Sequence, residues 1–158
     1  MSMDILKELR EETGLSFAQI KKALDEVGGD KEKAREMLAQ YSAASAEKKA
    51  DRELAAGVVS AYVHSTGTIG VLLELGCETD FVAKNEEFVA LAKDLAMHVC
   101  AMAPTSINNE DGAGDETSLM KQSFLKDSSI TVEQRIQAAI QKFGENTKVT
   151  RFARYSIA

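Results

Sequence analysis

The feature that most constrains this chain is a double change in the spacing of its apolar residues. Over residues 1–40 they recur every three or four positions, as on one face of a helix. Over 58–75 they alternate with a period of two, as in strands, and from residue 86 the helical spacing resumes. This order predicts an α+β fold in which three N-terminal helices precede an antiparallel sheet core covered by helices.

The N-terminal region predicts three short helices. Ser16 and Gln19 have the spacing of a capping box, in which each side chain satisfies a backbone amide of the other residue. Two glycines at 28–29 are expected to end the second helix, and Asp30 is expected to cap the third. A bundle this small buries little apolar surface, so it usually depends on a second domain or a partner.

Three segments divide the chain. Residues 1–40 form the first predicted domain, the small polar segment 41–47 is a predicted linker, and residues 48–158 form the predicted α+β core. The stretch 46–56 favours a helix by its composition, and Gly57 is expected to end that helix.

The elements of the core follow from the same spacings. Two β-rich runs joined by a glycine-containing turn predict a hairpin, and the last strand of the chain is expected to add to it. In order, the predicted elements are strands at 58–64 and 69–75, a helix at 86–103 stopped by Pro104, a short helix at 119–125, a helix capped by Thr131 and ended by Gly144, and a strand at 148–158.

Composition narrows the class of protein. A net charge of −6 and a pI of about 5.0 argue against broad binding to nucleic-acid phosphates. Aromatic residues make up 6% of the chain and tryptophan is absent, so a base-stacking platform is not expected either. No apolar run of about 18 residues predicts a membrane span, and no signal or transit pattern opens the chain. We therefore expect a cytoplasmic protein.

No familiar catalytic or cofactor motif is present in the sequence. There is no phosphate-binding loop, dinucleotide fingerprint, zinc-protease motif or nucleophile elbow. Cys77 and Cys100 form no CxxC pair and are expected to be buried. His64 is expected to face solvent and His98 to be a hydrogen-bonded structural residue. We expect no catalytic residue, no metal and no cofactor, and hence no enzyme.

One segment allows two interpretations. ETDFVAKN, residues 78–85, joins the second strand to the long helix. It can be a packed turn, in which Asp80 caps a turn of helix while Phe81 and Val82 fill the core. It can also be a functional loop that presents these side chains to a partner.

Four segments resemble signatures of the elongation factor Ts family. They are TGLSFAQIKKAL with the following GGD, CETDFVAKNEEF, KQSFLKDSSITVEQ and GENTKVTRFARY, at residues 13–30, 77–88, 121–134 and 144–155. They occur in the family's order and span nearly the whole chain, and ETDFVAKN is the most specific of them. With this resemblance, the functional interpretation of residues 79–82 is favoured.

The resemblance implies a fold, an activity and a set of site residues. The fold is a ubiquitin-associated-like three-helix domain followed by a core that carries exchange and dimerisation. The activity is guanine nucleotide exchange on elongation factor Tu during translation, without covalent chemistry. Thr79, Asp80, Phe81 and Val82 would dislodge Mg²⁺ from the partner, and Leu15, Phe17 and Lys21 would contact its GTPase domain.

The chain also departs from longer family members. It lacks their second core half and their coiled-coil insertion, and only a short acidic loop at 107–116 stands there, interpreted as a solvated spacer. Leu15 to Ala18 replace the more typical residues of the first signature. A homodimer could replace the missing half. The alternative function is a module that binds or chaperones elongation factor Tu without exchanging its nucleotide, and an unrelated enzyme is a distant third.

Overall fold

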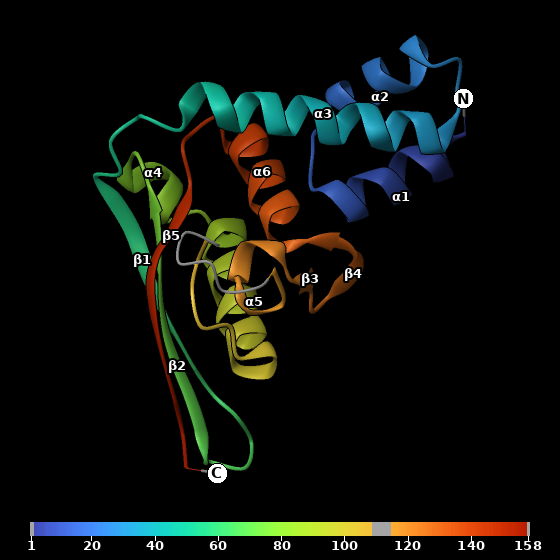
Figure 1. Ribbon diagram of the computed structural model, residues 1–158. Coiled ribbons are helices and arrows are strands. Elements are labelled where there is room, and N and C mark those ends of the chain that lie inside the picture. Colours follow the sequence, from blue (N-terminus) through green and yellow to red (C-terminus); the bar gives the residue numbers. More distant parts are fainter. Residues whose placement is uncertain (1, 109–114, 158) are drawn as a thin grey trace.

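A computed structural model describes residues 2–108 and 115–157 of the chain (Figure 1). Helices come first and an antiparallel sheet with covering helices follows, so the predicted α+β class is confirmed. The acidic loop predicted at 107–116 lies largely outside the described residues.

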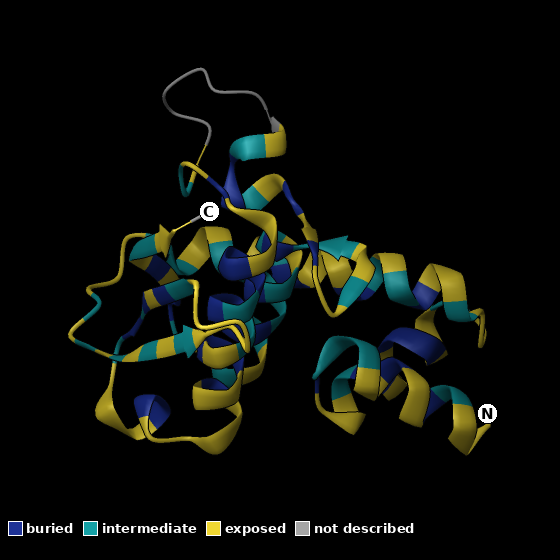
Figure 2. Cartoon of the chain, turned by 90° about the horizontal axis from the view of Figure 1, so that it is seen from below, coloured by how far each residue is buried: buried dark blue, intermediate teal, exposed yellow. Residues whose placement is uncertain are grey.

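The first three helices are α1 (Met3–Thr13), α2 (Phe17–Glu26) and α3 (Lys31–Lys49). Ser16 and Gln19 form the predicted capping box, and the Asp30 side chain accepts a hydrogen bond from the amide of Lys33. The three helices enclose a small apolar cluster of their own. Figure 2 shows these helices beside the rest of the chain, with buried residues marked along them.

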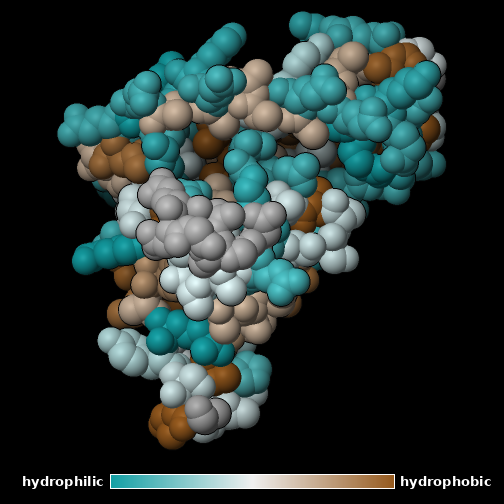
Figure 3. Space-filling model, in the orientation of Figure 1, coloured by the Kyte–Doolittle hydropathy of each residue, from teal (hydrophilic) through white to brown (hydrophobic). Residues whose placement is uncertain are grey.

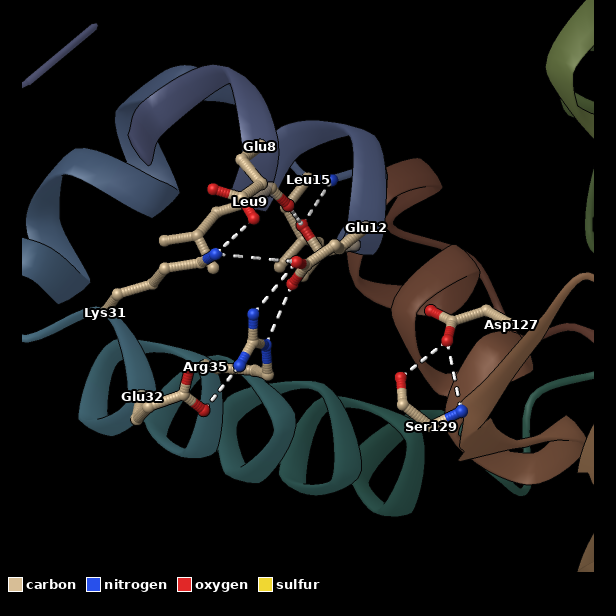
Figure 4. Close-up of polar contacts among 10 residues, drawn as sticks. Glu8, Leu9, Glu12, Leu15, Lys31, Glu32, Arg35, Asp127 and Ser129 are labelled. Carbon is tan, nitrogen blue, oxygen red and sulfur yellow. Dashed lines mark hydrogen bonds and ion pairs between the residues drawn. The ribbon is translucent and has the colours of Figure 1, made fainter. Parts of the chain in front are cut away.

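An ion-pair cluster joins α1 to α3 in this bundle. The guanidinium of Arg35 donates to both carboxylate oxygens of Glu12, each at 2.8 Å, and also contacts Glu32 (Figure 4). Lys31, which is also on α3, forms ion pairs with Glu8 and Glu12 of α1. A bidentate, partly buried pair is worth more than a single exposed contact, so the cluster supplements a small apolar core.

Helix α3 does not stop where the sequence suggested. It runs without a break through 41–47, the predicted linker, and ends at Lys49 instead of near residue 56. Ser42 is buried and its hydroxyl donates to the side chain of Gln141, while Ala46 packs against the core. Alanine favours helix and this face is covered by neighbours, so the segment has no reason to unwind.

Three strands form the sheet: β1 (Ala56–Val63), β2 (Ile69–Cys77) and β5 (Lys148–Ser156). They are antiparallel in the order β1-β2-β5, so the last strand adds to the hairpin as predicted. Gly57 lies inside β1 and does not end a helix. A side chain there would place its Cβ 2.5 Å from the carbonyl oxygen of Leu75, so the strands can approach only at a glycine.

Helix α5 (Glu86–Met102) covers one face of this sheet, and α6 (Val132–Phe143) packs against α3. The predicted helix at 119–125 is only a single 3-10 turn, η3 (Leu119–Lys121), which follows η2 (Asp115–Thr117). A small hairpin that the sequence did not predict comes next, made of β3 (Ser123–Phe124) and β4 (Asp127–Thr131). Thr131 then caps α6 with a capping box, and Gly144 ends it.

His98 is fully buried and connects α5 to the β3–β4 hairpin, which confirms its expected structural role. Its Nδ1 accepts from the amide of Leu125 at 3.1 Å, and its Nε2 lies 2.9 Å from Oε1 of Gln122. The Gln122 amide nitrogen donates to the carbonyl of Glu116, so its oxygen must face the histidine. The neutral ring protonated at Nε2 satisfies every partner.

We expect this histidine to make stability depend on pH. Burial lowers the pKa of His98 below its ordinary value, although the Gln122 hydrogen bond opposes the change. Above about pH 6.5 the ring is neutral whether the chain is folded or unfolded; below it, protons bind the unfolded chain preferentially. The free energy of unfolding should fall as the pH drops below about 6.5. Urea unfolding across pH 5–8 tests this, and the fall should be smaller in His98→Asn.

Candidate functional site

The candidate site is the junction between β2 and the helix α5. A single helical turn, α4 (Asp80–Ala83), follows β2 directly. Thr79 is its N-cap: the Thr79 hydroxyl accepts from the amide of Val82 at 3.4 Å, and its carbonyl accepts from the amide of Ala83 at 3.2 Å. The cap is therefore Thr79, whereas the packed-turn interpretation assigned it to Asp80.

The two large apolar residues of this turn differ in burial. Val82 is only 5% exposed and belongs to the core, whereas Phe81 is 86% exposed. The packed-turn interpretation is thus right for Val82 and wrong for Phe81. Figure 3 shows hydrophobic surface at the position that α4 occupies in Figure 1. The exposed ring does not fit a packed turn, which leaves the second interpretation, a segment that presents its side chains to solvent.

Asp80 and Thr79 are exposed beside the ring. The turn therefore presents a carboxylate and an aromatic ring together, on a base formed by Val82 and Ala83. Within residues 2–108 and 115–157, no three or more histidine, cysteine or acidic side chains are placed to hold a metal ion.

Cys77 lies under the turn at the end of β2. Its thiol donates to the carbonyl of Thr79 at 3.3 Å. Burial raises the pKa of this thiol, and the nearby carboxylate of Glu145 raises it further. The group therefore remains a protonated thiol near neutral pH and supports the turn as a buried residue, as expected from the sequence.

Sequence reasoning missed Glu145, which stands in the turn between α6 and β5. Its carboxylate accepts from the amides of Glu78 and Thr79, at 3.1 and 2.9 Å, and from the hydroxyl of Thr79 at 2.6 Å. The only sequence signal was indirect, because Glu145 lies in the segment GENTKVTRFARY that resembles the family. Nothing in that segment indicates contact with a residue 66 positions earlier.

The second group of predicted site residues lies on the N-terminal helices. Leu15 is 1% exposed inside the helical cluster, so it cannot touch a partner directly in this structure. Phe17 is 40% exposed with the guanidinium of Arg10 at 4.4 Å from its ring centre, and Lys21 is exposed. Figure 1 places α2 and α4 toward opposite ends of α3, so the two predicted groups form separate surfaces.

No helix in the described part of the chain is both long and apolar enough to span a membrane.

The chain is similar to known proteins that share one family description. The family model described as Elongation factor TS matches residues 4–115. The chain is 42% identical over 193 residues to elongation factor Ts of Desulforamulus reducens, covering 99% of this chain and 89% of that protein. It is 40% identical over 191 residues to the protein of the same name from Thermotoga petrophila, covering 99% and 96%. A longer relative from a Synechococcus species is 42% identical over 194 residues, covering 98% of this chain and 69% of that protein.

The different burial of Phe81 and Val82 predicts different effects on stability. Phe81→Ala should change the free energy of unfolding by no more than about 0.5 kcal/mol, because its ring is already in water. Val82→Ala should lower it by about 1–3 kcal/mol, because it removes buried methyl groups. Urea unfolding of both variants measures the difference. An equal loss in both would show that the Phe81 ring is packed in solution.

Proposed function

This chain belongs to the elongation factor Ts family, and from that premise we propose that it is a guanine nucleotide exchange factor for elongation factor Tu, acting in the cytoplasm during translation elongation. The observation that carries the proposal is the exposed Phe81 on its capped turn, beside Asp80. The chain would act by binding alone. When it binds, the affinity of elongation factor Tu for GDP falls, and no covalent bond is made or broken.

The turn would act on the Mg²⁺ and phosphate site of the partner. Mg²⁺ requires near-octahedral oxygen ligands, so a small displacement of those ligands is costly. Phe81 would insert into an apolar gap of the GTPase domain, and the Asp80 carboxylate would disturb the ligand and water shell of the metal. Thr79 and Val82 would hold the turn, in keeping with the cap made by Thr79 and the burial of Val82.

One side chain cannot supply the whole effect. Burying a phenylalanine is worth roughly 1.5–3 kcal/mol, whereas a thousandfold loss of nucleotide affinity needs roughly 4 kcal/mol. A second contact must therefore contribute. Coupling is reciprocal, so GDP should weaken the binding of this chain to its partner by the same factor, which makes the complex transient.

We assign that second contact to the N-terminal helices, as an anchoring domain. Phe17 and Lys21 are exposed and available for it, and the buried Leu15 would act by holding the start of α2. Two separate apolar clusters support a division into an N-terminal domain at 1–40 and a core at 48–158. Because α3 continues through 41–47, the connection sets a fixed spacing between the two contacts and raises the effective concentration of the second.

A homodimer is the second part of the proposal, and the uncovered face of the sheet supports it. Helix α5 covers only the inner face. The strand register places Val59, Val63, Leu72 and Tyr155 together on the outer face, and all four are exposed. A three-stranded sheet with this much apolar surface in water is suited to packing against a second copy.

The exchange function predicts the effect of one substitution. Phe81→Ala should slow the release of fluorescent GDP from elongation factor Tu by about tenfold or more at equal concentration, since the lost burial is worth one to two powers of ten. Leu125→Ala is the matched control, because Leu125 is also an exposed apolar residue but lies on the β3–β4 turn. Stopped-flow fluorescence measures both variants.

Two results would contradict the proposal. If the unmodified chain binds elongation factor Tu but does not accelerate GDP release, it is a binding or chaperone module. If Phe81→Ala is as active as the unmodified chain, exchange does not depend on this turn.

The dimer predicts a different result. Leu72→Arg places a charge on the outer face and should raise the dimer dissociation constant by about tenfold or more, while Leu125→Arg leaves it unchanged. Sedimentation equilibrium measures the constant. A monomer at every concentration of the unmodified chain would rule out this part of the proposal.

A further inference from the structure

A four-residue helix cannot hold an exposed aromatic ring by itself. Nucleating one helical turn is unfavourable, and short isolated helices are unstable in water. Phe81 contributes no packing to α4, because its side chain is 86% exposed. The direction of the ring must therefore be maintained by contacts at the base of the turn.

Glu145 supplies these contacts from a distant part of the sequence. One carboxylate oxygen accepts from the amides of Glu78 and Thr79, and the other accepts from the hydroxyl of Thr79. Because that hydroxyl donates to Glu145, its lone pairs remain free to accept from the amide of Val82. The carboxylate thus orients the group that caps α4, and hydrogen bonds to a charged acceptor are the stronger kind.

The turn between α6 and β5, which contains Glu145, is also hydrogen-bonded to the segment that follows α3. The Asn146 amide donates to the side chain of Glu78 at 2.8 Å, and the Asn146 side chain donates to the carbonyls of Ala50 and Arg52 at 3.4 and 2.8 Å. Asn146 is buried, so these bonds are shielded from water. The adjacent residues Glu145 and Asn146 therefore connect the base of α4 to the segment that leaves α3.

We propose that Glu145 is a positioning residue for exchange, which sets the direction of Phe81 through Thr79. The inference rests on the proposed exchange function. Glu145 touches neither nucleotide nor metal in this role. Its loss leaves the N-terminal contact, which anchors the complex, in place and lets the turn sample other directions. It therefore lowers the rate of the exchange step more than the affinity for the partner.

The test is Glu145→Gln, which keeps the shape of the side chain but removes its charge and replaces one of its two accepting oxygens with an NH2 group. The maximal rate of GDP release at saturating factor should fall about tenfold, while the half-saturating concentration stays within about twofold. Glu133→Gln is the matched control, because Glu133 is a half-buried glutamate of α6 paired with Lys121 at 3.3 Å. The control should leave both values unchanged. A maximal rate in Glu145→Gln equal to that of the unmodified chain overturns the proposal.

Amide hydrogen exchange separates this inference from the exchange function itself. In Glu145→Gln the amides of Thr79 and Val82 should exchange about tenfold faster, with the amides of α5 unchanged. If the unmodified chain does not accelerate GDP release from elongation factor Tu, the proposed function fails. The hydrogen-exchange measurement then decides by itself whether Glu145 holds the turn. Unchanged protection at Thr79 then overturns the inference.

A second pair of variants covers the case in which Glu145→Gln does not fold. Thr79→Ser keeps the hydroxyl that binds Glu145, whereas Thr79→Val removes it. A maximal rate about tenfold lower in Thr79→Val than in Thr79→Ser supports the role of Glu145. Equal rates in the two variants overturn it.

Discussion

The packing of α5 against the inner face of the sheet is the contact on which the rest of the structure depends. The central strand β2 is buried there through Val71, Leu73 and Leu75, and β1 and β5 pair with it on either side. This burial holds the end of β2 at Cys77, three residues before α4 begins at Asp80. It covers one face only, so the outer face stays exposed. One apolar contact therefore defines two of the three surfaces proposed for partners, the α4 turn and the outer face of the sheet.

The candidate site combines a rigid base with an exposed tip. Val82 and Ala83 are part of the core, the Thr79 cap orders the turn, and the carboxylate of Glu145 receives three hydrogen bonds beneath it. Phe81 gains nothing from this arrangement in the isolated chain. In the proposed complex this exposed side chain becomes buried, while the groups beneath it are already satisfied in the isolated chain. Stability and the proposed binding are thus assigned to different residues of one short segment.

Much of the fold could be predicted from spacing and capping residues. The helix starts at Ser16, Asp30 and Thr131 follow from local hydrogen bonds, which depend on a few neighbouring residues only. The errors occur where packing outweighs local preference. The segment 41–47 is helical because it lies against α6, and the β3–β4 hairpin forms where His98 binds the amide of Leu125. Both contacts join residues far apart in the sequence.

The sequence by itself determined the types and order of most elements, the family, and the segment at 79–82 as the candidate site. These depend on local periodicity and on side-chain chemistry, which are properties of neighbouring residues. Only the tertiary structure decided that Phe81 faces solvent while Leu15 is buried, and that Glu145 lies under Thr79. The position of Glu145 depends on how the turn before β5 meets the end of β2, and the burial of Leu15 depends on the packing of the three N-terminal helices. Contacts between residues far apart in the sequence determine these arrangements, and no local sequence pattern indicates them.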